Sequence, residues 1–125
     1  MVNTISIEKI GEDERGCTHA FNTDRTGQFM IAYRKAGSLS GRHYHKGLSH
    51  NKNPEKIIIM QGAATINWFD VNGSEKGSVE VKAPVMVVIQ PWAWHEVAAD
   101  TDLVVLELNG PADGPSDTFQ LEESK

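Results

Sequence analysis

Short apolar segments separated by turn-forming residues run along nearly the whole sequence, and this pattern limits the fold more than any other feature. No segment repeats its apolar residues with the 3.6-residue period of an amphipathic helix over three turns. Many short strands with turns between them are typical of an all-β sandwich or barrel. Because closing a sheet removes its exposed edges and creates an interior, we expect a barrel with room for one small site.

The expected strands cover the chain up to about residue 109. We predict strands at 2–7, 17–22, 28–35, 55–61, 63–70, 78–82, 85–89, 93–98 and 102–108. Segment 28–35 is apolar and aromatic enough for a strand that is buried on both faces. From Gly110 onward the chain is rich in proline, glycine and acidic residues, so we expect 110–125 to be a tail with little structure. The prediction is one domain, 1–125, with a barrel over about 2–109.

Composition narrows the class of function. A chain of 125 residues can bury a real core, but its net charge of −5 argues against a nucleic-acid binder. The longest apolar run, 85–89, is too short to span a bilayer, and no signal-peptide pattern opens the sequence. The single cysteine, Cys17, excludes an intramolecular disulfide and is expected to be a small buried residue. We therefore expect a cytoplasmic protein that binds a small molecule.

Two histidines, His43 and His45, are separated by one residue in a strand-like stretch, so both imidazoles point to the same face. Glu55 shares a face with two isoleucines of the next strand, where an acid is costly unless it is paired or binds a metal. We predict that these residues and His95 meet inside the barrel as metal ligands. Three imidazoles and one carboxylate suit Fe(II), Mn(II), Ni(II) or Zn(II), and the ligand set does not choose among them.

These residues resemble the motifs of the cupin superfamily, over roughly residues 37–108. In residues 37–45 a glycine, five residues and His-x-His follow one another, and in 55–62 a glutamate, six residues and a glycine. The gap between the two halves is longer than in the family and contains His50, a rival ligand to Glu55. The resemblance implies a double-stranded β-helix, that is, a jelly-roll barrel.

Three stretches carry a narrower resemblance to cupins that act on nucleotide-linked keto-sugars: Asp13-Glu14-Arg15-Gly16, Gly41-Arg42-His43-Tyr44-His45-Lys46 and Trp94-His95-Glu96. Those cupins are deoxysugar epimerases and 3,4-ketoisomerases. The resemblance implies a metal-free site in which His43 is the base and Arg15 lies near the substrate phosphates. Further candidate substrate contacts are Arg42, Tyr44 and Gln61.

Three functions stay open at this stage. The first is a metal-dependent isomerase or dioxygenase acting on a small oxygen-rich substrate. The second is a metal-free isomerase or epimerase of a dTDP-keto-sugar with a histidine base. The third is a binding module for a small ligand without catalysis. Trp94 points outward in the predicted strand, and a subunit contact around it would make the protein a homodimer.

Overall fold

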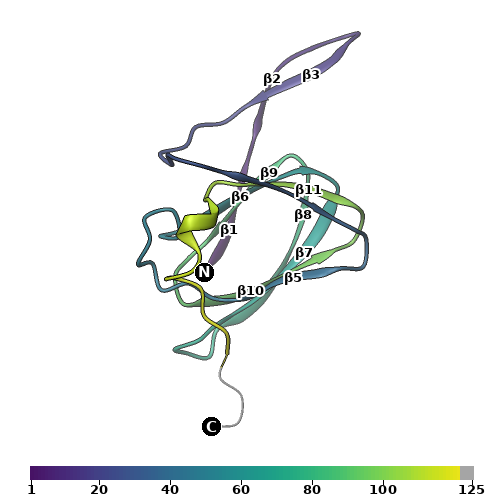
Figure 1. Cartoon of the computed structure of the whole chain (residues 1–125). Helices are drawn as coiled ribbons and strands as arrows, with labels where there is room; N and C mark the ends of the chain where they lie inside the picture. The colour runs from purple at the N-terminus through teal and green to yellow at the C-terminus, as the bar shows by residue number, and fades with distance from the viewer. Residues whose placement is uncertain (122–125) are drawn as a thin grey trace.

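The computed structural model describes residues 1–121, which form a jelly-roll barrel of two antiparallel sheets (Figure 1). The first sheet has the order β1 (Val2–Ser6), β9 (Val85–Ile89), β6 (Glu55–Gln61), β11 (Leu103–Glu107) and β4 (Met30–Arg34). The second has the order β5 (Leu39–His43), β10 (Ala93–Ala99), β7 (Ala63–Asp70) and β8 (Lys76–Lys82). The prediction of an all-β, cupin-like double-stranded β-helix is confirmed. Within residues 1–121 no helix is long and apolar enough to cross a membrane.

The core lies between the two sheets, because alternate residues of each strand point inward. Its fully buried members come from both sheets: Ile59, Ile66, Val87, Ile89, Ala64 and Ala93. A smaller apolar cluster lies on the outer face of the five-stranded sheet, where Ile7 and Phe29 pack on Ile58, Met86, Val88 and Leu108. The larger core therefore fills the space between the sheets, and the histidines lie beside it at one end of the barrel.

A two-stranded hairpin projects from the barrel (Figure 1). It consists of β2 (Glu8–Asp13) and β3 (Gly16–Ala20), which pair with each other and are exposed along almost their whole length. The sequence predicted β3 but not β2, because the charged stretch of β2 lacks an apolar alternation. Cys17 lies in this hairpin and is exposed, so the prediction of a buried cysteine was wrong.

Strand β4 is an edge strand that pairs with β11 on one side. Its inward residue Ala32 packs on the core, whereas Ile31 and Tyr33 are 57% and 72% exposed. The prediction of burial on both faces was wrong, because the apolar residues of β4 face outward at the edge of the sheet.

The segment after β11 packs on the barrel and does not hang free. It begins with a short 3-10 helix, η1 (Pro111–Asp113), and its Phe119 pairs with Tyr44 through two backbone hydrogen bonds. The expectation of a tail with little structure was therefore wrong for residues 110–121, and 122–125 lie outside the described residues. We call residues 110–121 the C-terminal strap, since they cross the end of the barrel near the histidines.

Candidate active site

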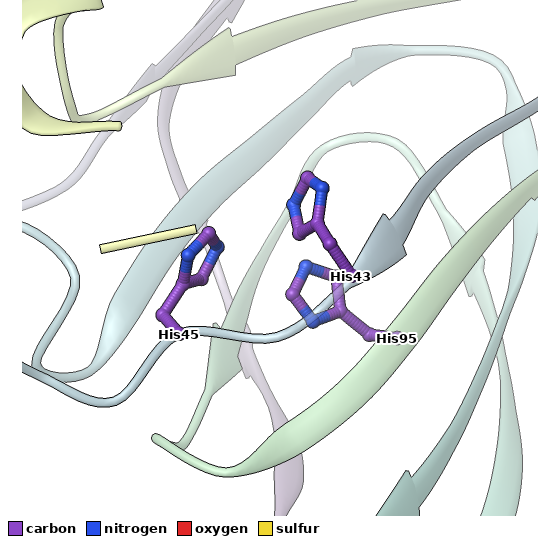
Figure 2. Close-up of side chains that lie close together, drawn as sticks. All are labelled: His43, His45 and His95. Carbon is purple, nitrogen blue, oxygen red and sulfur yellow. The ribbon is translucent and has the colours of Figure 1, made fainter. Parts of the chain in front are cut away.

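Three histidines converge at one end of the barrel, and Figure 2 shows their rings facing one another. His43 ends β5 and pairs directly with His95 of β10, while His45 follows two residues later. The ring centroid of His43 lies 4.8 Å from that of His45 and 5.1 Å from that of His95. Ring nitrogens of the three residues lie within 4.8 Å of one another. The alternation of side chains after β5 places His43 and His45 on the same side, and the pairing of β5 with β10 brings His95 next to them.

A bulge just before His43 sets this register. The pairing of β5 with β10 shifts between His95 and Glu96, and Gly41 and Arg42 both have left-handed backbone, with φ of 78° and 63°. A Cβ atom at Gly41 would lie 3.2 Å from the carbonyl oxygen of His95, so glycine permits the close approach of the two strands. Because of the bulge, the side chain of Arg42 points to the outside of the barrel. Its guanidinium forms an ion pair there with Glu96.

Glu55 begins β6 and is buried beside the histidines. Its Oε1 lies 3.2 Å from Nε2 of both His45 and His95, and the Lys52 ammonium lies 3.0 Å from its Oε2. Burial alone would raise the pKa of Glu55, but the hydrogen bonds from the two histidines and the charge of Lys52 hold that pKa well below its usual value. The side chain of Glu55 is therefore a deprotonated carboxylate that its contacts hold in one position. The amide of Asn109, which accepts a hydrogen bond from Lys52, completes this buried cluster.

Backbone carbonyls fix the two inner rings. Nδ1 of His45 donates to the carbonyl oxygen of Asp117 at 2.6 Å, and Nδ1 of His95 donates to that of Ala93 at 3.0 Å. Each Nε2 is consequently turned toward Glu55. The carboxylate of Asp117 accepts hydrogen bonds from two amides of the loop that follows His45, so the C-terminal strap holds this loop as well as the ring.

His43 differs from the other two because it is only half-buried, and it lines a cavity in front of its ring. Burial lowers its pKa, and the nearby rings of His95 and His45 lower it further, to about 4. At neutral pH the imidazole of His43 is uncharged and able to accept a proton. A neutral imidazole at a cavity wall has the properties of a general base.

The space in front of His43 is a cavity of about 120 Å³ inside the barrel. Its wall contains both polar and aliphatic residues: Arg34, Ser40, His43, Glu55, His95 and Glu107, with Ala32, Ile57, Ile89, Val97 and Val105. Typical ligand pockets measure about 300–1,000 Å³. The cavity therefore suits one small polar ring and not a whole nucleotide.

The structure brings together the four predicted residues His43, His45, Glu55 and His95, but it places the other candidates elsewhere. Four candidates lie away from the cavity. Tyr44 stacks between Trp92 and Phe119, Gln61 is exposed at the end of β6, His50 is exposed, and Arg15 lies in the turn of the hairpin. Arg42, as described, pairs with Glu96 on the outside.

Sequence reasoning missed Lys52, Asp117, Arg34 and Glu107. For Glu107 a signal existed, because it shares the inward face of β11 with Leu103 and Val105, the same argument that identified Glu55. For Lys52 the only signal was its position three residues before Glu55. Nothing in the sequence pairs Asp117 with His45, since 72 positions separate them.

The model of the polysaccharide biosynthesis C-terminal domain family matches residues 11–108. The chain belongs to this family. This polysaccharide biosynthesis C-terminal domain has no match among the curated proteins.

Several solved structures share this fold, among them a ketoisomerase, an epimerase and a capsular polysaccharide assembling protein. The 3,4-ketoisomerase QdtA from Thermoanaerobacterium thermosaccharolyticum, in complex with TDP, is 20% identical with a TM-score of 0.73, over 98% of this chain and 89% of that one. The dTDP-4-dehydrorhamnose 3,5-epimerase from Sulfolobus tokodaii is 17% identical with a TM-score of 0.73, over 98% and 77%. The capsular polysaccharide assembling protein CapF from Staphylococcus aureus is 26% identical with a TM-score of 0.60, over 94% of this chain and 34% of CapF.

The predicted transition metal (Fe, Mn, Ni or Zn) is contradicted by these comparisons. Related structures are described as isomerases or epimerases in complex with TDP or with dTDP-linked sugars. This domain also offers a physical reason, because the buried ammonium of Lys52 already contacts Glu55 at 3.0 Å. The positive charge that a metal would bring to the carboxylate is thus supplied by the protein itself.

Proposed function

We propose that this domain is an isomerase or epimerase of a nucleotide-linked keto-sugar and that His43 is its base. The observation that carries the proposal is the neutral imidazole of His43, which faces a small cavity beside the hydrogen-bonded cluster of Glu55, His45 and His95. A base of this kind removes a proton from the carbon next to a carbonyl group. The fold that the domain shares with 3,4-ketoisomerases and 3,5-epimerases supports this reaction class.

The rest of the cavity suits the same chemistry. Proton removal next to a carbonyl leaves negative charge on oxygen, which a fixed positive charge stabilises. Arg34 lines the cavity and is exposed, so its guanidinium could meet the diphosphate of a nucleotide sugar. The aliphatic wall would contact the sugar ring and exclude water from the reacting carbons.

We further propose a homodimer in which the hairpin of one copy closes the cavity of the other. Arg15, the expected phosphate contact, lies in an exposed hairpin turn and cannot serve the cavity as a wall residue of its own barrel. The outer face of the five-stranded sheet exposes Ile5, Ile31 and Met60 in addition to Tyr33. Such an apolar face is typical of a subunit interface. The cytoplasmic location expected from the sequence stays a prediction.

The test is to incubate the protein with TDP-4-keto-6-deoxyglucose in D₂O and follow the sugar by NMR. We expect deuterium to enter next to the carbonyl, with migration of the carbonyl or inversion of a neighbouring carbon. The His43→Asn variant should lose both signals, by about 10²-fold or more, and should still show a TDP-induced rise in Tm. Binding of TDP without exchange in the wild type would instead favour a binding module. Activity that chelation abolishes and a divalent metal restores would overturn the metal-free mechanism.

A further inference from the structure

Glu107 is a carboxyl group in the cavity that the proposed role of His43 does not use. It ends β11, pairs in register with Met30 of β4 and Ile57 of β6, and lines the same cavity as His43. Its side chain is half-buried. Because residues 103 and 105 of the strand point into the core, Glu107 also points inward at the position where the core gives way to the cavity.

The two carboxyl groups of the cavity have opposite surroundings. Glu55 contacts His45, His95 and Lys52, whereas within residues 1–121 no side chain lies within ion-pair or hydrogen-bond distance of the Glu107 carboxyl. Burial raises the pKa of Glu107 and the negative charge of Glu55 raises it further, while the more distant charges of Lys52, Arg34 and His45 offset only part of this rise. A half-buried carboxyl without a partner costs stability, and its place at the cavity wall gives it access to a substrate.

We infer that Glu107 is a second catalytic residue, which carries a proton between two adjacent oxygens of the sugar while His43 carries a proton between the two carbons. This inference rests on the proposed function and assigns the reaction to the ketoisomerase type. Carbonyl migration requires both transfers, since the old carbonyl oxygen gains a proton and the neighbouring hydroxyl loses one.

The step balances without any further reactant. His43 takes the proton from the carbon that bears the hydroxyl, the C–H electron pair forms a carbon–carbon double bond, and the carbonyl oxygen receives the proton of Glu107. The product of this half is a neutral enediol, with a charged imidazolium and a carboxylate. In the second half Glu107 takes the proton of the neighbouring hydroxyl, a new carbonyl forms there, and His43 returns its proton to the old carbonyl carbon. Both residues end in the state in which they began.

The test separates the carbon transfer from the oxygen transfer. Glu107→Gln keeps the size of the side chain but cannot carry a proton, and Glu80→Gln on the exposed strand β8 is the matched control. With TDP-4-keto-6-deoxyglucose in D₂O, we expect Glu107→Gln to slow carbonyl migration by about 10²-fold or more, the usual range for a lost acid–base group. Deuterium exchange at the carbon next to the carbonyl should fall less than migration, because exchange needs only the enolate that His43 forms, whereas migration also needs both oxygen transfers. Glu80→Gln should match the wild type.

Two outcomes would overturn the inference: migration at the wild-type rate in Glu107→Gln, or equal loss of exchange and migration in a variant that still binds TDP. If Glu107→Gln fails to fold, the Glu107→Ala variant with added formate takes its place, since formate can restore the missing carboxyl. Recovery of migration by formate would support the inference, and no recovery would contradict it. A wild-type protein that catalyses neither exchange nor migration would instead defeat the proposed function itself.

Discussion

Two ion pairs in this molecule have the same chemistry and opposite surroundings. Lys52 and Glu55 meet at 3.0 Å inside the barrel, with side chains that are 7% and 5% exposed. Arg15 and Asp13 meet at 2.7 Å in the hairpin turn, with side chains that are 85% and 41% exposed. The first pair is held by its surroundings and cannot separate without leaving a buried charge. The second is surrounded by water, so Arg15 can exchange its partner for a substrate phosphate at little cost.

The largest effect on stability should come from breaking the buried pair. Glu55→Gln leaves the ammonium of Lys52 buried without a carboxylate, which costs about 3–5 kcal/mol in typical proteins. Urea denaturation should show this loss, while Lys82→Met on an exposed position of β8 should have little effect. A Glu55→Gln variant as stable as the wild type would show that the interior solvates Lys52 by other means.

A smaller loss should follow from removing the carboxylate of Asp117, which is fully buried. It accepts hydrogen bonds from the backbone amides of Lys46 and Ser49, at 2.7 and 3.0 Å. Asp117→Ala leaves these amides without their acceptor. Because both hydrogen bonds are only part-buried and water can reach the freed amides, the total cost should be about 1–3 kcal/mol. Thermal unfolding measures the loss. Unchanged stability together with unchanged activity would mean that the strap does not hold the loop in solution.

A third effect depends on pH and should be smaller still, because His43 is only half-buried. Its pKa is lowered from 6.5 to about 4 on folding. Between these values the unfolded chain binds a proton at His43 and the folded chain does not, so the contribution of His43 to the free energy of unfolding falls as pH drops from about 6.5 to about 4. The free energy of unfolding, measured by urea titration at several pH values in this range, should fall more steeply with decreasing pH in the wild type than in His43→Gln. Parallel curves would contradict the assigned neutral state.

The smallest effect on stability is expected at the exposed pair, and its effect on function should be large. Arg15→Ala should leave Tm unchanged and weaken binding of TDP in calorimetry. If the hairpin of one copy serves the cavity of the other, a mixture of the Arg15→Ala and His43→Asn variants should regain part of the activity that each variant lacks. In a mixed dimer, the Arg15→Ala copy keeps an intact His43, and the His43→Asn copy supplies an intact Arg15 to the same site. A mixture that stays inactive, although mass analysis shows mixed dimers, would place Arg15 outside the site.

The sequence predicted the barrel and the four clustered residues for the same reason. Strand alternation and the spacing of the histidine motif are local, and the strands carry their side chains to a predictable face. Arg42 was expected near the substrate from the family resemblance alone, and it lies outside because it is the bulged residue beside His43, on the face opposite the imidazoles. Lys52 and Asp117 lie in a loop and in the strap, where long-range hydrogen bonds fix each position and no periodicity exists to be read.

The strap has a consequence for how the protein is made. The strands that build the barrel end at Glu107, yet the orientation of His45 waits for Asp117, and its loop is held by the same residue. During synthesis every strand of the barrel is therefore complete before the residue that orients His45 has been added. A nascent chain interrupted between Glu107 and Asp117 would contain all the strands but lack the carbonyl and carboxylate that hold His45 and its loop.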